Sequence, residues 1–242
     1  MRRIGLIGGT SWESTAHYYA QLNQGVAQRL GGFHSADLVL RSVDFAEIEA
    51  LQSAGDWPAL GTRYATEAAG LRAAGAEVIG ILANTMHLVH DDVVRGGAGA
   101  TVVHVVDAVG RAAVELGVTR LALLGTRYTM ESDLYPDRLR ARGLTVQAPT
   151  GPDAAETHRI IYDELVHGVV RDGSRDALCA VVDRLVDAGA EAVVLGCTEL
   201  AMILGPDDVP VPVLDSTALH VHALLEAATQ SQSQIPSERG AA

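Results

Sequence analysis

The chain contains no lysine, and all 18 of its basic residues are arginine. A pyridoxal phosphate enzyme needs a lysine for its Schiff base and a P-loop needs one at the phosphates, so both kinds of chemistry are excluded. Cysteine is scarce too, and Cys179 and Cys197 are the two that occur. Two cysteines provide no disulfide framework, which is typical of a protein from a reducing compartment.

Basic residues are also outnumbered, because 30 acidic residues against 18 basic ones give the chain a net charge of -12. A chain this acidic matches nucleic acid or an anionic membrane poorly, so we expect neither as a partner. No apolar run reaches the roughly 18 residues of a membrane-spanning helix. The basic start at residues 1–3 precedes an apolar stretch that is too short for a signal peptide. Together these absences predict a cytoplasmic protein.

Short apolar runs alternate along the chain with longer segments rich in Ala, Leu, Arg and Glu. This alternation predicts an α/β fold. The expected strands are 3–8, 37–43, 77–83, 101–106, 120–125, 144–148, 191–197 and 211–214. The expected helices are 14–28, 56–74, 86–95, 107–116, 134–141, 153–170, 174–188 and 216–228.

The two halves of the chain resemble each other. GLIGGT, starting at residue 5, recurs as ALLGT about 117 residues later, and AGAEVIGILA, ending at residue 83, recurs as AGAEAVVLGC about 114 residues later. We therefore expect two pseudo-symmetric lobes. The first covers 1–106, with about 211–228 returning to it, and the second covers 107–210. The Ser- and Gln-rich end, 229–242, is expected to be a flexible tail.

Two matching strand ends carry different side chains. The apolar run 78–82 leads into Ala83, and the run 192–196 leads into Cys197. The carboxyl ends of parallel strands are where α/β proteins bind small molecules, so a matching pair indicates two halves that face one cleft. One half presents a thiol at this point and the other presents a methyl group.

Cys197 is the sharpest candidate for chemistry. It stands between an apolar strand and an expected helix start, where backbone N–H groups and the helix dipole stabilise a thiolate. A buried cysteine that serves as a small hydrophobic side chain is the competing interpretation, and both stay open. For Cys179, inside the helix expected at 174–188, we expect core packing.

Small polar residues gather at the expected strand ends. Asn84, Thr85 and Thr198 could donate hydrogen bonds to a carboxylate, together with exposed N–H groups at two helix starts. They could equally well do no more than cap those helices. The same pattern continues at Thr10, Ser11 and Thr126.

We expect no cofactor and no metal. The glycines within 5–9 lack the spacing of a dinucleotide-binding loop. His87 and His90 lie three residues apart, and His220 and His222 lie two apart, with no third zinc ligand nearby. His87 falls near the presumed cleft, where a partly buried structural histidine is the expected role.

At these residues the chain resembles the pyridoxal-independent aspartate/glutamate racemase superfamily, in particular its broad amino-acid racemase branch. The motifs that carry the resemblance are GGTSWEST at 8–15 with Tyr18-Tyr19, SVDF at 42–45, NTMH at 84–87, GT at 125–126 with TM at 129–130, IYDE at 161–164 and GCTE at 196–199. They cover nearly the whole chain up to about residue 228, and six motifs in the same order are very specific.

The resemblance implies two Rossmann-like lobes with parallel sheets, an active site between them, and a homodimer. In such racemases two cysteines flank the α-carbon of the substrate, and no cofactor takes part. One thiolate removes the proton and the opposite thiol returns one to the other face. Cys197 matches the second cysteine. The residues that the resemblance places around a small amino-acid or carboxylate substrate are Thr10, Ser11, Asn84, Thr85, Thr126, Thr129, Thr198 and Glu199.

Ala83 departs from the family pattern, because this position carries the first cysteine or, in some relatives, a threonine. Three explanations stay open: a deliberate replacement, a natural one-base enzyme, or a water or His87 that stands in for the base. Many dicarboxylate-specific relatives also have a lysine where this chain has Val166, so a side-chain carboxylate would need an arginine such as Arg41.

We therefore predict a cofactor-independent amino-acid racemase, an isomerase, that lacks one thiol base. A single-cysteine decarboxylase of the arylmalonate type and a catalytically silent amino-acid-binding homologue are the alternatives.

Overall fold

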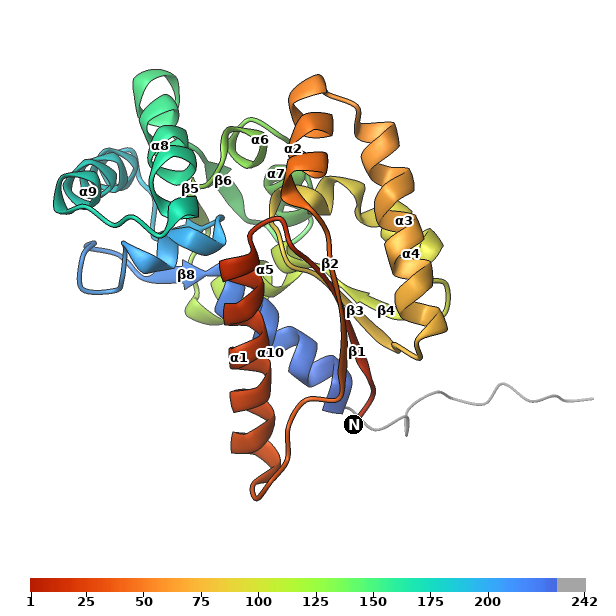
Figure 1. The fold of residues 1–242 in the computed structure, drawn as a ribbon. Coiled ribbons are helices and arrows are strands. Elements are labelled where there is room, and N and C mark those ends of the chain that lie inside the picture. The colour runs from red at the N-terminus through yellow and green to blue at the C-terminus, as the bar shows by residue number, and fades with distance from the viewer. Residues whose placement is uncertain (230–242) are drawn as a thin grey trace, which may run out of the picture.

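The computed structural model describes residues 1–229 and contains two four-stranded parallel sheets with helices packed against them (Figure 1). The strand order is β2-β1-β3-β4 in the first sheet and β6-β5-β7-β8 in the second. The strands are β1 (Ile4–Gly8), β2 (Leu38–Ser42), β3 (Val78–Ile81), β4 (Thr101–Val103), β5 (Arg120–Leu124), β6 (Thr145–Gln147), β7 (Ala192–Leu195) and β8 (Val213–Asp215). The two-lobe parallel α/β fold is confirmed.

Helices connect the strands of each sheet. The α-helices are α1 (Trp12–Leu30), α2 (Phe45–Ala54), α3 (Trp57–Ala73), α4 (His90–Gly96), α5 (Val105–Leu116), α6 (Arg127–Met130), α7 (Leu134–Arg140), α8 (Gly151–Asp163), α9 (Asp172–Asp187) and α10 (Ser216–Thr229). Three 3₁₀-helices are η1 (Thr85–Val89), η2 (Leu165–His167) and η3 (Thr198–Met202). Within residues 1–229 no helix combines the length and the apolar character needed to cross a bilayer.

Each sheet is buried on both faces, which explains why its strands read as continuous apolar runs. On β7, Val193 and Leu195 belong to the core beneath α8 and α9, whereas Ala192 and Val194 belong to the core beneath α5 and α7. The first sheet alternates in the same way between α3 on one face and α1 with α10 on the other.

The segment 211–228 does not return to the first lobe as a unit. Its strand, β8, pairs with β7 in the second sheet, so that part of the expected domain division is corrected. Helix α10 does pack against the first lobe. Its Leu224 lies directly on Gly80 of β3, where an added Cβ at residue 80 would come within 2.9 Å of Leu224 Cδ1. The expected tail at 229–242 lies outside the described residues, except for Thr229, which ends α10.

One strand end, one helix end and one additional helix differ from expectation for local reasons. The strand expected at 101–106 stops at Val103, because the His104 ring accepts a hydrogen bond from the Val106 N–H and caps α5. The helix expected at 153–170 ends at Asp163, where Glu164 turns inward to Ser174, 2.6 Å away. Helix α2 was not expected, and Asp44 caps it by accepting from the Ala46 N–H.

Candidate active site

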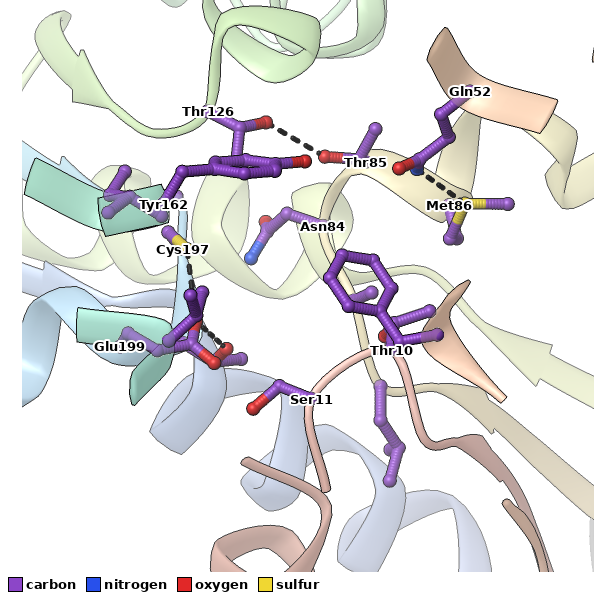
Figure 2. A pocket seen from close by; sticks show the side chains of 17 residues that line it. Thr10, Ser11, Gln52, Asn84, Thr85, Met86, Thr126, Tyr162, Cys197 and Glu199 are labelled. Carbon is purple, nitrogen blue, oxygen red and sulfur yellow. Dashed lines mark hydrogen bonds between the residues drawn. The ribbon is translucent and has the colours of Figure 1, made fainter. Parts of the chain in front are cut away.

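A cavity of about 60 Å³ lies between the two lobes at the carboxyl ends of their strands (Figure 2). Its walls come from segments that follow β1, β3, β5 and β7, together with α2 and α8. The lining residues are Thr10, Ser11, Phe45, Gln52, Leu82, Ala83, Asn84, Thr85, Met86, Thr126, Ile161, Tyr162, Val166, Gly196, Cys197, Thr198 and Glu199. Of the ten positions expected at the site, nine line this cavity, and Thr129 lies behind it, completely buried.

The loop after β1 is shaped by a glycine. Gly9 has φ 99°, and a Cβ there would lie 2.2 Å from the Val43 carbonyl oxygen. Its N–H donates to Thr15 Oγ1 at 2.9 Å, and Ser11 Oγ accepts from the Ser14 N–H at 3.1 Å to cap α1. The chain can therefore turn sharply enough to bring Thr10 and Ser11 to the cavity wall.

Three threonine hydroxyls join the lobes. Thr85 Oγ1, at the start of η1, lies 3.0 Å from both Thr126 Oγ1 and Thr129 Oγ1, and the latter two lie 3.3 Å apart. Each hydroxyl can donate one hydrogen bond and accept two, so the cluster can turn one donor toward a ligand while the other two donors stay within it. Oxygen atoms of a carboxylate are suited to such donors.

Asn84 is held from two sides. Tyr135 Oη donates to its Oδ1 at 2.6 Å, and its Nδ2 donates to Ser216 Oγ at 2.9 Å. Ser216 Oγ in turn donates to the Leu195 carbonyl oxygen at 2.6 Å, which ties the ends of β3 and β7 together. One amide hydrogen is committed in this way, so a single N–H is the donor that Asn84 can offer to a ligand.

Cys197 lies beside a buried carboxylate, that of Glu199. Its Sγ–H donates to Glu199 Oε2 at 3.1 Å, and the Thr198 hydroxyl donates to the same oxygen at 2.6 Å (Figure 2). Burial first, and the charge of Glu199 second, raise the pKa of the Cys197 thiol well above 9.0. The backbone N–H groups of Thr198 and Glu199 lower this pKa without outweighing burial, and the thiolate expected at Cys197 stays a prediction.

Glu199 is itself buried, with 5% of its surface exposed. While Oε2 accepts two hydrogen bonds, Oε1 has no hydrogen-bond partner among the described residues. A buried carboxylate oxygen without a partner is costly, so this atom is suited to a donor that arrives with a ligand.

An apolar wall completes the cavity, and sequence reasoning missed most of it. The apolar side chains are Phe45, Leu82, Met86, Ile161 and Val166. Gln52, 5% exposed, reaches the same wall and its Nε2 lies 3.1 Å from Met86 Sδ. Phe45 and Gln52 belong to the unexpected helix α2, and no motif pointed to Gln52, although Phe45 ends the SVDF motif at 42–45. Met86 and Ile161 were visible in the family motifs, although we assigned them no role.

His87 does not stand in for the base that Ala83 lacks. Its Nδ1–H donates to the Ala83 carbonyl oxygen at 3.0 Å, and its Nε2 accepts from the Val105 N–H at 3.2 Å. Both ring nitrogens are thus used, and His87 is absent from the cavity lining. Burial also lowers its pKa well below the usual value, in line with a neutral structural ring.

Other suggested residues lie away from the cavity. Arg41 Nε pairs with Glu67 Oε2 at 2.6 Å and does not line the site. Cys179 lies on α9, where its Sγ is 3.4 Å from the Asp208 carbonyl oxygen, and packs against the second-lobe core. Among residues 1–229 no group of three or more His, Cys, Asp and Glu side chains could hold a metal ion.

A family model described as Asp/Glu/Hydantoin racemase matches residues 7–224. A Yersinia pestis structure with a provisional Asp/Glu racemase assignment is 43% identical, with 95% of this chain and 100% of that chain covered and a TM-score of 0.89. An aspartate racemase homologue from Pyrococcus horikoshii OT3 is 35% identical over 95% of this chain and 100% of its own, with a TM-score of 0.83. Aspartate racemase from Picrophilus torridus, 21% identical over 94% of each chain with a TM-score of 0.68, shares the fold.

Proposed function

Because the chain belongs to the Asp/Glu/hydantoin racemase family, as its motifs predicted, we propose that it moves a proton at the α-carbon of a small amino acid. The reaction uses no cofactor, and it uses one base rather than two. Cys197 is the group that exchanges protons with the substrate, and Ala83 leaves the other face without one.

One observation carries this proposal: a single thiol and a single methyl group end equivalent strands of the two lobes and line one cavity. Cys197 follows β7, and Ala83 follows β3 at the corresponding position of the other sheet. A methyl group transfers no proton, so inversion through two opposed thiols is not available to this chain. Around the thiol, the hydroxyl cluster and the Asn84 amide supply donors that could stabilise the charge of a carboxylate as a carbanion forms.

The Cys197 thiol first gives its proton to solvent, and the resulting thiolate takes the α-proton. The S–H bond forms as the C–H bond breaks, and the electron pair of the C–H bond stays on the α-carbon, delocalised into the carboxylate. The same thiol, after exchange with solvent, returns a proton to the same face. The result is α-hydrogen exchange with retained configuration.

The test is to incubate each enantiomer of a panel of amino acids in D₂O with the enzyme and to follow α-deuteration and inversion by NMR and chiral chromatography. We expect one enantiomer to exchange and keep its configuration. Cys197→Ser should lower the exchange rate by about 10²–10⁴-fold, the usual effect of losing a positioned acid–base group. Cys179→Ser is the matched control and should exchange like the parent. Equal exchange in the two variants would refute the role of Cys197.

Ala83→Cys provides a gain-of-function test. If Ala83 marks the missing base, a thiol there should allow a proton to be returned to the opposite face, and inversion should appear alongside exchange. Ala83→Val is the steric control, because its added methyl groups fill space and carry no proton that could be transferred. Fast inversion by the parent enzyme, or no gain in the cysteine variant, would contradict the one-base proposal.

The raised pKa of the Cys197 thiol favours a second candidate, a cofactor-free decarboxylase of the arylmalonate type. In that reaction a malonate loses carbon dioxide, the electron pair of the broken C–C bond remains as an enolate, and the thiol delivers its proton to carbon. Release of carbon dioxide from phenylmalonate would support it. Binding of amino acids without exchange would instead indicate a silent binding protein. The homodimer and the cytoplasmic location stay predictions, the former open to light scattering.

A further inference from the structure

The charges around the cavity are unbalanced in a way that selects a ligand. Glu199 is the one acidic side chain among the lining residues, and none of them is arginine, lysine or histidine. The cation suggested from the sequence, Arg41, forms an ion pair with Glu67 and does not line the cavity. An empty site of this kind carries one negative charge and has nothing on the described lining to neutralise a second or a third.

The unpartnered atom is on that same carboxylate. Glu199 is 5% exposed, and its Oε1 makes no hydrogen bond to any residue from 1 to 229. The carboxyl group lies between Cys197 and Ser11 at the cavity wall (Figure 2). Because a buried carboxylate oxygen loses its water and gains nothing in return, a cationic donor at this position would be strongly favoured.

The rest of the wall divides into two further zones. The Thr85 and Thr126 hydroxyls and the Asn84 amide present neutral donors suited to one carboxylate. Phe45, Leu82, Met86, Ile161 and Val166 present carbon and sulfur surface. A ligand that satisfies all three zones has one ammonium group, one carboxylate and an apolar side chain.

We infer that the site takes a zwitterionic α-amino acid with a short, uncharged, apolar side chain, and that Glu199 Oε1 accepts a hydrogen bond from its α-ammonium group. The inference rests on the proposed function, since it assigns the substrate of that same cavity. It separates this chain from a site for aspartate or glutamate, whose second carboxylate would lie near Glu199 with no cation beside it. A malonate dianion would meet the same repulsion.

Charge at Glu199 also links binding to chemistry. The carboxylate of Glu199 is one of the causes that raise the pKa of the Cys197 thiol. An ammonium group beside Oε1 offsets that negative charge, so it lowers the thiol pKa toward its ordinary value. The Cys197 thiolate would therefore form more readily when the substrate is bound than in the empty site.

The test is calorimetric titration of the full chain with three ligands: L-2-aminobutyrate, butyrate, which lacks the amino group, and L-aspartate. The parent protein should bind 2-aminobutyrate about 10- to 100-fold more tightly than butyrate, the range for a hydrogen bond to a charged group. It should bind aspartate at least about 10-fold more weakly than 2-aminobutyrate. Equal affinities for 2-aminobutyrate and butyrate, or tighter binding of aspartate, would overturn the inference without any variant.

Glu199→Gln keeps the size of the side chain and removes its charge. In this variant the preference for 2-aminobutyrate over butyrate should fall to within about twofold, and the penalty on aspartate should shrink. Glu115→Gln on the exposed face of α5 removes the same charge far from the lining residues and should leave both preferences intact. If Glu199→Gln keeps the preference of the parent, the ammonium contact is wrong.

The two proposals fail in different ways. Selective binding of 2-aminobutyrate without any α-deuteration in D₂O would leave the ligand assignment standing and refute the racemase-type reaction. Ready α-deuteration of aspartate, unaffected by Glu199→Gln, would support proton transfer and refute the ligand assignment.

Discussion

Replacement of Tyr135 by phenylalanine removes one oxygen atom from a chain of hydrogen bonds that crosses between the lobes. Tyr135 is fully buried on α7, and its hydroxyl donates to Asn84 Oδ1 at 2.6 Å. Asn84 Nδ2 donates to Ser216 Oγ at 2.9 Å, and Ser216 Oγ donates to the Leu195 carbonyl oxygen at 2.6 Å. The variant leaves Asn84 Oδ1 as a buried acceptor without a partner, while the ring of residue 135 keeps its packing.

The size of the effect follows from that orphaned acceptor. Leaving a buried polar group unsatisfied costs about 1–3 kcal/mol. For a protein of this length each 1 kcal/mol lowers the melting temperature by roughly 2–4 °C, so Tyr135→Phe should melt roughly 2–12 °C lower than the parent. Asn84 is also freed to rotate, so ligand affinity should fall along with stability.

Differential scanning calorimetry or thermal circular dichroism measures the change, with Tyr64→Phe as the matched control. Tyr64 is also buried, at 1% exposure, but its hydroxyl makes no hydrogen bond to any residue that the structure describes. The control should therefore melt within about 2 °C of the parent. Equal melting temperatures for the two variants would refute the reasoning that the Asn84 chain stabilises the contact between the lobes.

Three further predictions address protonation and backbone geometry. Alkylation of Cys197 by iodoacetamide should be slow near neutral pH and accelerate only above pH 9.0, because the pKa of the thiol is raised. Glu199→Gln should move that acceleration to lower pH. Fast labelling of the parent protein at pH 7 would contradict this prediction. Burial lowers the pKa of His220 from 6.5 to about 4, so the unfolded chain binds the extra proton. The contribution of neutral His220 to the free energy of unfolding is therefore complete above pH 6.5 and falls by up to about 3 kcal/mol as the pH drops to 4. In urea titrations, His220→Gln should show a weaker dependence of the unfolding free energy on pH. The same pH dependence in the parent and the variant would contradict the assignment. Gly9→Ala should destabilise the fold by more than about 2 kcal/mol in urea unfolding, because φ is 99° and the Val43 backbone blocks the added Cβ. Gly70→Ala on α3, where a Cβ would meet no atom within 4 Å, should be neutral or slightly stabilising. Similar results for both variants would show that the loop after β1 tolerates a side chain.

Much of the fold could be predicted from local patterns. Strands buried on both faces must be apolar throughout, so runs such as 78–82 and 192–196 identify themselves in the sequence. The ends of parallel strands share one edge, so the residues that follow these runs were expected to meet. Ala83 and Cys197 do line one cavity.

Features that depend on distant partners could not be predicted in this way. The apolar run at β8 fits either sheet, and its hydrogen bonds to β7, with Val213 opposite Val193, decide the matter. Helix α2 has apolar and polar residues in no clear period, and its contribution of Phe45 and Gln52 to the cavity appears only in three dimensions.

The sequence by itself determined the chemical inventory: a family of proton-transfer enzymes, one thiol at residue 197, a methyl group at residue 83, and no lysine to bind a cofactor or a second carboxylate. Only the tertiary structure decided the state of those groups. It folds Glu199 back onto the thiol, buries the carboxylate and leaves one carboxylate oxygen without a hydrogen-bond partner among residues 1–229. Protonation and ligand charge depend on burial and on neighbours in space, and neither can be read from residue order alone.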